Sequence, residues 1–180
     1  MEPNSLNMET YLNRISAFDK EQTYTLDDRI ISNGQAQWDL QDIQNVHLSF
    51  KPTKHYDNIY QCAIESRSGK ITLSNRRYIG PANFDYQSAE YSQFVRSLLL
   101  NLDGYGLTNF KSGKSKSTYW LEVIASAFFF GLMLIVLTMF GAWLVSLVFL
   151  AIIIFRLIPY YKKNLPMTFS AKHIPDHILP

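Results

Sequence analysis

The sequence predicts a mainly β domain closed by one amphipathic helix and followed by a hairpin of two transmembrane helices. Three observations lead to this fold class. Short apolar segments separated by turn residues occupy the first half of the chain. A stripe of apolar residues at helical spacing follows them. An apolar tract without a single charged residue then runs from Val123 to Phe155.

The predicted strands begin near Tyr24 and end near Pro81. The segment from Val46 to Phe50 alternates apolar and polar residues, as a strand with one buried face does. Ser66 to Gly69 separates two further apolar segments and predicts a hairpin connection. The remaining predicted strands lie at 24–26, 29–31, 60–64, 71–73 and 77–81. This pattern indicates antiparallel strands that form a small curved sheet or barrel.

The predicted helix runs from Ser88 to Leu102. Ser88 is expected to cap it, Glu90 suits its first turn, and Gly104 lies just past its end. Its apolar positions are Tyr91, Phe94, Val95, Leu98, Leu99 and Leu102. Because this spacing puts them on one face, we expect the sheet to bury the stripe.

The apolar tract is too long for one membrane crossing. As a single helix it would measure about 50 Å, against a hydrocarbon core of about 30 Å. We therefore predict two arms, Tyr119–Thr138 and Gly141–Ile158, joined by a tight turn. Lys and Arg flank the tract on both sides, and because such residues favour the cytoplasmic face, both termini are expected there. The alternative is a re-entrant hairpin that does not fully cross.

Charge is divided unevenly along the chain. Residues 1–110 hold 10 Lys and Arg against 13 Asp and Glu, whereas residues 111–180 hold 7 against 2. The basic half borders the apolar tract, which favours contact with anionic membrane lipids. The acidic first half argues against nucleic acid as a partner. The organisation that follows is a flexible or amphipathic segment at 1–22, a folded domain at 23–103, a basic linker at 104–118, the hairpin at 119–158 and a Pro-rich cytoplasmic tail at 159–180.

The segment at 1–22 is polar but places Tyr11, Leu12, Ile15 and Phe18 at the spacing of a short amphipathic helix. Pro166, Pro175 and Pro180 interrupt the tail, which therefore cannot form one long helix. We expect it to be an extended strap that lies along the domain or along another subunit. The residues of this possible partner strap are Pro166, Phe169, Ile174, Pro175 and Leu179.

Four segments of the domain, Trp38–Ile43, Tyr60–Ile64, Gly69–Leu73 and Tyr91–Val95, resemble bacterial pleckstrin-homology-like (PH-like) domains. The resemblance covers residues 23–102 and implies a small β-barrel capped by a C-terminal helix. The order of domain, hairpin and Pro-rich end is similar to that of small proteobacterial membrane proteins, largely of unassigned function. This similarity implies a multi-pass protein of the bacterial inner membrane.

The basic residues that could form an anionic-ligand surface are Lys51, Lys54, Arg76 and Arg77. PH domains that bind phosphoinositides carry basic residues around the first hairpin, whereas here Asp27 and Asp28 make that hairpin negative. We expect no metal site, because Pro175 interrupts the spacing between His173 and His177. Cys62 lies on a predicted strand and is expected to be a buried, unreactive side chain.

We find no catalytic or phosphate-binding motif, and we expect neither an enzyme nor a cofactor. The expected function is a non-catalytic membrane-anchored scaffold or assembly subunit, which presents the domain to a protein partner or to further copies of itself. The alternative is a module that binds or senses anionic lipids. Basic residues clustered around a concave pocket would favour the lipid module, and scattered ones would favour the scaffold.

Overall fold

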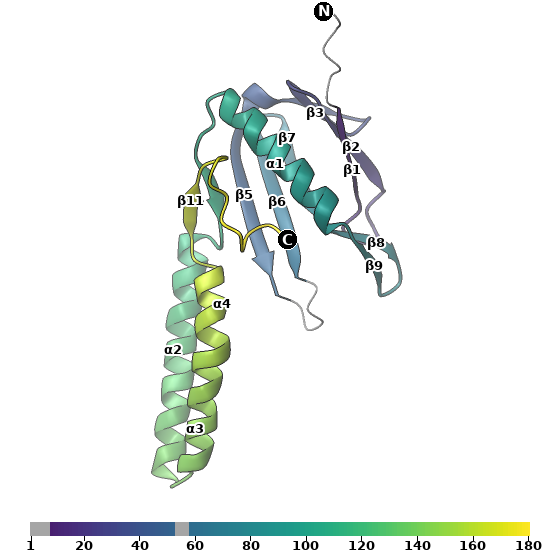
Figure 1. Ribbon diagram of the computed structural model, residues 1–180. Helices are drawn as coiled ribbons and strands as arrows, with labels where there is room; N and C mark the ends of the chain where they lie inside the picture. Colours follow the sequence, from purple (N-terminus) through teal and green to yellow (C-terminus); the bar gives the residue numbers. More distant parts are fainter. Residues whose placement is uncertain (1–7, 53–57) are drawn as a thin grey trace, which may run out of the picture. The chain divides into compact units, whose positions relative to one another are not determined.

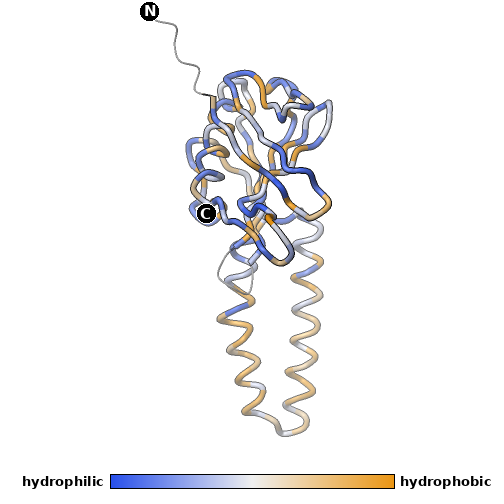
Figure 2. The backbone as a smooth tube through the Cα atoms, turned by 90° about the vertical axis from the view of Figure 1, so that its right-hand side faces the viewer, coloured by the Kyte–Doolittle hydropathy of each residue, from blue (hydrophilic) through white to orange (hydrophobic). Residues whose placement is uncertain are grey.

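The computed structural model describes residues 8–52 and 58–180, which divide into two compact units. The first unit, here called the domain, comprises Met1–Ser112 together with Thr168–Pro180. The second, here called the hairpin unit, is Gly113–Met167. The hairpin unit is therefore an insertion between two parts of the domain. Figure 2 shows that apolar residues dominate the two arms of the hairpin unit, whereas the domain mixes polar and apolar residues.

The described strands of the domain form three sheets (Figure 1). The first is antiparallel and follows chain order: β1 (Glu9–Asn13), β2 (Gln22–Leu26), β3 (Ile30–Ser32) and β4 (Gln37–Asp39). The second has the order β11 (Met167–Phe169), β10 (Phe110–Ser112), β5 (Ile43–Lys51), β6 (Ile59–Ser66) and β7 (Gly69–Ser74). The third is a hairpin of β8 (Arg76–Gly80) and β9 (Asn83–Tyr86).

Period-two alternation explains the buried face of the second sheet. In β5, Val46, Leu48 and Phe50 are buried and the intervening side chains are more exposed. The helix α1 (Ser88–Gly104) buries all six residues of its predicted apolar stripe. The expected helix and its buried face are thus confirmed.

The start of α1 differs in detail from the prediction. Its N-cap is Gln87, which makes no side-chain capping bond, so the capping role predicted for Ser88 is wrong. The Ser88 hydroxyl instead lies 3.5 Å from Nδ2 of Asn75, which donates to it. The helix also includes Gly104 and ends at that residue.

The described sheets do not close into one barrel, because a side chain takes the place of a strand pairing between β1 and β7. Asn13 is buried, and its Nδ2 donates to the carbonyl of Thr72 at 2.9 Å while its Oδ1 accepts from the N–H of Ser74 at 3.2 Å. The hydroxyl of Tyr11 donates to the carbonyl of Ser74. A mainly β domain followed by two long apolar helices is confirmed, whereas the finer prediction of a PH-like barrel is not.

Replacing Asn13 by alanine is expected to destabilise the domain by about 1–3 kcal/mol for each backbone group left buried without a partner. Denaturant unfolding of the full chain in mild detergent, followed by near-ultraviolet circular dichroism, measures the loss. Asn45 is the matched control, because its amide donates to Glu65 on the exposed surface. Asn45→Ala should change stability by less than about 0.5 kcal/mol. Equal effects of the two substitutions would contradict the bridging role of Asn13.

The structure of the N-terminal segment differs from the sequence prediction. Residues 9–13 of the segment predicted as flexible or as an amphipathic helix form β1, with Tyr11 and Asn13 buried and Leu12 partly exposed. Pairing with β2 makes the segment a strand, in which the side chains of Glu9, Tyr11 and Asn13 lie on the more buried face. Ile15 and Phe18 follow in the connection to β2, where Phe18 is 98 % exposed. Residues 1–7 lie outside the described part.

The predicted linker and tail also contain parts of the domain. Residues 104–118 include β10, which pairs in parallel with β5 and places Ser112 opposite Leu48. Residues 159–180 include the end of the second apolar arm, then β11 and a final segment that packs into the domain core. The core residues of that segment are Phe169, Ala171, Ile178 and Leu179. The domain is therefore completed by residues on both sides of the hairpin unit.

The hairpin unit has two arms, each long and apolar enough to cross a membrane. The first is α2 (Lys116–Met139), which Ser115 caps through a bond from the N–H of Thr118. The second runs without a break through α3 (Trp143–Ile152), a π-helical segment (Ile153–Leu157) and α4 (Ile158–Lys163). The first arm extends beyond both of its predicted ends, whereas the second begins two residues after Gly141 and continues five residues past Ile158.

The turn between the arms contains a glycine in the left-handed conformation. Gly141 has φ 71°, and its N–H donates to the carbonyl of Thr138 at 3.0 Å. The N–H of Ala142 donates to the carbonyl of Leu137 at 2.9 Å, which completes a Schellman motif at the end of α2. This motif reverses the chain without a polar loop, so the expected tight turn is present.

Candidate functional site

The structure does not gather the predicted basic residues around a pocket. Lys51 is exposed at the end of β5, whereas Arg76 and Arg77 lie on β8. The guanidinium of Arg77 is paired with Asp85 at 2.9 Å and with Glu21 at 3.6 Å. That of Arg76 lies 4.0 Å from the ring centroid of Phe84.

Lys54, the fourth predicted basic residue, lies outside the described part of the chain. The three described ones line neither of the two pockets considered below. Arg77 is already paired with two carboxylates, and Arg76 contacts an aromatic ring. Lys51, Arg76 and Arg77 therefore make separate local contacts and do not form one binding site for a lipid headgroup.

The predicted partner strap lies along its own domain, which is one of the two places that the sequence left open. Phe169 and Leu179 are buried, and the ring of Phe169 lies 5.8 Å from that of Phe110. Ile174 packs against the core, and the Ser92 hydroxyl on α1 donates to the carbonyl of Pro180 at 3.1 Å. Pro166 and Pro175 are half-buried. In this fold the strap is part of the domain rather than a free segment.

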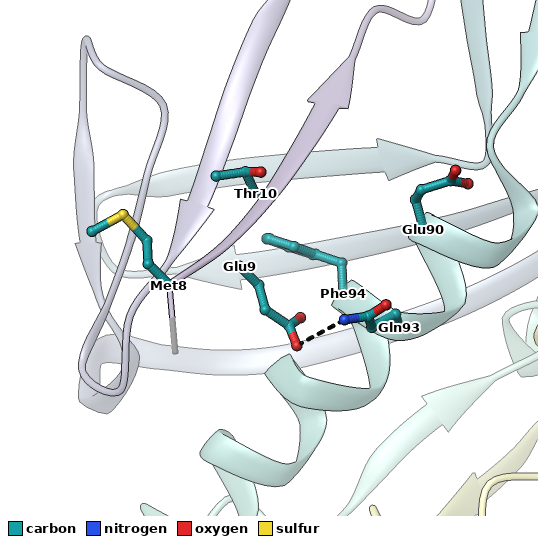
Figure 3. A pocket seen from close by; sticks show the side chains of 6 residues that line it. All are labelled: Met8, Glu9, Thr10, Glu90, Gln93 and Phe94. Atoms are coloured by element: carbon teal, nitrogen blue, oxygen red, sulfur yellow. Dashed lines mark hydrogen bonds between the residues drawn. The ribbon is translucent and has the colours of Figure 1, made fainter. Parts of the chain in front are cut away.

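A pocket of about 250 Å³ opens where β1 meets α1 (Figure 3). Its lining residues come from two parts of the chain that are remote in sequence, namely Met8, Glu9 and Thr10 on one side and Glu90, Gln93 and Phe94 on the other. The amphipathic spacing of α1 turns Phe94 inward and leaves Glu90 and Gln93 at the rim. This pocket is the candidate functional site, and we call it the acidic pocket.

The two oxygens of Glu9 have different surroundings. Oε1 accepts from the Ser97 hydroxyl at 2.8 Å and from Nε2 of Gln93 at 3.5 Å. Oε2 is buried, and no hydrogen-bond donor of the described residues reaches it. A buried carboxylate oxygen that accepts no hydrogen bond destabilises the folded domain, and an N–H group of a bound partner would remove this destabilisation.

The charge around the acidic pocket is negative. Glu90 adds a second carboxylate, and no Lys or Arg is among the lining residues. Burial, and after it the charge of Glu90, raises the pKa of the neighbouring Tyr11 above its ordinary value. The pocket therefore offers carboxylates to a cation and an apolar wall, formed by Phe94 and Met8, to the alkyl stem of a long basic side chain.

Sequence reasoning missed this site, because Glu9 and Glu90 belong to elements that meet only in the folded domain. No local signal could have found it: Glu9 is polar, and it lies on the inward face only because residues 9–13 form a strand, whose side chains alternate between two faces. The six lining residues offer two carboxylates and an apolar surface, which together suit the binding of a basic side chain.

A second pocket, of about 360 Å³, lies beside the connection from β1 to β2. Arg14 organises this connection, because its guanidinium donates to the carbonyls of Ala17 and Asp19 and lies 5.1 Å from the ring centroid of Tyr78. The charges of Arg14 and Lys20 are offset in part by Asp19. This pocket thus has no strong preference for an anion or a cation.

A polar cluster joins the two ends of the hairpin unit, and we call it the clamp. The ammonium of Lys114 donates to Glu122 and to the hydroxyl of Tyr160, the latter at 2.7 Å. The hydroxyl of Tyr161 donates to the backbone carbonyl of Glu122 at 3.0 Å. The N–H of Lys114 donates to the carbonyl of Asn164 at 3.1 Å. The first and last residues of the unit are therefore bonded to one another.

Beside the clamp, the backbone of Gly113 packs closely against the backbone of Asn164 and Leu165. A Cβ at this position would lie 2.3 Å from the carbonyl oxygen of Leu165, and φ is +82°. Both facts restrict the position to glycine. Glu122, in the first turns of α2, is paired with Lys114, and its side chain remains partly exposed.

No family model, no curated protein and no solved structure matches this chain.

Proposed function

We propose that this chain is a non-catalytic, membrane-anchored scaffold or assembly subunit, whose domain offers the acidic pocket to a basic side chain of a protein partner. One observation carries the proposal. The hairpin unit is inserted between β10 and β11, which are neighbouring strands of one sheet. The domain is thus attached to its anchor by two connections rather than by one tether.

Both connections are short, since β10 ends at Ser112 and α2 begins at Lys116, while α4 ends at Lys163 and β11 begins at Met167. The clamp joins them further through Lys114. Two short connections keep a domain within a few residues of its anchor, whereas one long flexible linker would let it move far away. A domain kept close to its anchor in this way suits an assembly subunit.

The same insertion supports the predicted topology at the bacterial inner membrane. Two neighbouring strands of one sheet lie on one side of a membrane, so both ends of the hairpin unit belong to that side. The flanking basic residues favour the cytoplasmic face. In chain order the domain has four strands, three strands, the hairpin of β8 and β9, and then the helix α1, and this succession of strands before a closing helix supports the proposal that the domain is PH-like.

Reporters that are active only in the cytoplasm test this topology. Fused to either terminus of the full chain, each should give a signal, whereas a reporter inserted at Phe140 in the turn should give none. A signal at the turn as well would favour the re-entrant hairpin. A signal at one terminus only would contradict two crossings and, with them, the insertion of the hairpin between two strands of one domain.

The scaffold function is tested by purifying the full chain in mild detergent and measuring which proteins remain bound in stoichiometric amounts. The variant Glu9→Gln with Glu90→Gln should lose the partner, because it removes both charges of the acidic pocket and keeps the size of the side chains. The matched control is Asp27→Asn with Asp28→Asn, which removes two charges from the connection between β2 and β3.

The opposite result would support the lipid alternative. In that case no protein would be retained, and flotation with phosphatidylglycerol vesicles would depend on Lys51, Arg76 and Arg77. We expect neutralisation of these three residues to leave partner retention unchanged, since none of them lines the acidic pocket.

A further inference from the structure

Three charged residues belong to the second apolar arm: Lys162 and Lys163 lie in its last turn, whereas Arg156 lies nearer the turn between the arms. Arg156 belongs to the π-helical segment of the span Trp143–Lys163, and its side chain is exposed on the surface of the hairpin unit. Three residues after Arg156 comes Pro159, which has no N–H to donate to the carbonyl of residue 155. The N–H of Ile158 donates to the carbonyl of Ile153, as in a π-helix. Short π-helical segments of this kind are frequent at functional sites.

The hydroxyl of Tyr161 indicates how deep Arg156 lies. It bonds to the Ser126 hydroxyl at 2.6 Å and to the carbonyl of Glu122, so these residues of the two arms are at one level. Arg156 precedes Tyr161 by about 7 Å of helix and follows Trp143 by about 20 Å. With a hydrocarbon core of about 30 Å, a hairpin that crosses it holds the backbone of Arg156 closer to the centre of the bilayer than Tyr160 and Tyr161, which lie near the end of the arm.

The hairpin unit cannot neutralise this arginine itself. All of Gly113–Met167 is described, and its one acidic residue is Glu122. Both carboxylate oxygens of Glu122 accept hydrogen bonds from Lys114. A second copy of the hairpin would bring the same occupied carboxylate and therefore no counter-charge.

The direction of the helix disfavours contact with the nearer lipid headgroups. Each Cα–Cβ bond of a helix tilts toward the helix N-terminus, which in this arm is the turn at Gly141. The side chain of Arg156 thus begins by pointing away from the headgroups beside Tyr160 and Tyr161. Charged residues at such depth pair with an opposite charge, and an arginine fork pairs best with a planar carboxylate.

We propose that Arg156 binds, within the membrane, the carboxylate of an Asp or Glu on a transmembrane helix of a different protein. This inference rests on the proposed membrane anchoring, and it assigns the scaffold a second contact that is separate from the acidic pocket. The acidic pocket selects a basic group outside the membrane, and Arg156 selects an acidic one inside it.

The probe is a synthetic polyleucine transmembrane peptide that carries one Glu at the depth of Arg156, with an identical Gln peptide for comparison. The full chain is reconstituted in phosphatidylcholine vesicles, and energy transfer is measured from a donor dye on Leu100→Cys to an acceptor on the peptide. Leu100 is 54 % exposed, whereas Cys62 is buried and its pKa is raised by that burial to about 12, so the dye reacts with the new thiol.

The Glu peptide should associate at about tenfold lower peptide-to-lipid ratio than the Gln peptide. Arg156→Gln should abolish the difference, Arg156→Lys should keep part of it, and Lys162→Gln should keep all of it. Equal association of the two peptides with the wild-type chain overturns the inference. So does a preference that survives Arg156→Gln.

Two further measurements separate the explanations. If Arg156→Gln reduces contact with spin-labelled phosphatidylglycerol while the peptides remain equivalent, the guanidinium binds lipid phosphate and the inference is overturned. Extraction of the wild-type chain by alkaline carbonate would overturn the membrane anchoring itself, and the proposed function with it. A chain that resists extraction but shows no peptide preference keeps the proposed function and loses only this inference.

Discussion

Phe94→Ala is expected to lower the free energy of unfolding of the domain by about 3–5 kcal/mol. Phe94 is 2 % exposed on the inner face of α1, and its ring lies 5.6 Å from that of Tyr11. Removing it leaves a cavity between the helix and β1 that the surrounding side chains cannot fill. Denaturant unfolding of the full chain in mild detergent, followed by near-ultraviolet circular dichroism, measures the change.

Trp38 is the comparison for this substitution. The sequence pattern treats Trp38 and Phe94 alike as core residues, whereas Trp38 is only partly buried at the edge of the core. Trp38→Ala should therefore cost less than Phe94→Ala. An equal or larger cost would mean that the contacts of α1 contribute less to stability than its burial indicates.

Removal of residues 168–180 is expected to have a still larger effect, because it withdraws Phe169, Ile178 and Leu179 from the core. Each buried side chain of this size contributes about 1.5–3 kcal/mol, and a typical domain has a total stability of about 5–15 kcal/mol. The truncated domain should become sensitive to protease, while the hairpin unit still inserts into the membrane. Limited proteolysis and carbonate extraction report the two results separately.

A single substitution in the same segment tests the same contacts without the risk that truncation causes aggregation. Leu179→Ala should destabilise the domain by about 2–5 kcal/mol, whereas Lys172→Gln, at an exposed position of the same segment, should have no measurable effect. Unchanged unfolding of the truncated chain together with loss of a bound protein would instead show that the strap belongs to a partner.

These expectations reverse part of what the sequence predicted for the tail. The pattern of prolines and apolar residues predicts an extended strap, whereas beyond the end of β11 residues 168–180 contain two turns, closed by the N–H groups of His173 and Ile178. The sequence further predicts that the tail and the hairpin carry the essential contact with a partner, so that deleting residues 164–180 weakens complex formation and leaves membrane insertion intact. Burial of Phe169 and Leu179 in the domain core makes the same deletion a loss of stability.

Local pattern alone determined the elements whose cause is local. The buried face of α1 follows from apolar residues at helical spacing, and β5 follows from alternation. The two apolar arms follow from length against the thickness of a bilayer. The position of the turn at Gly141 could also be predicted from the sequence, because the left-handed conformation that ends α2 favours glycine.

Tertiary structure decided the features that depend on residues far apart in the chain. Pairing with β2 made residues 9–13 a strand, although their apolar spacing also suited a helix. Residues 168–180 return to the domain core, so the hairpin unit is an insertion within one domain and does not simply follow it. The acidic pocket exists because β1 and α1 pack together and bring Glu9 close to Glu90. Such contacts leave no periodic signal, since they arise from the packing of whole elements rather than from neighbouring residues.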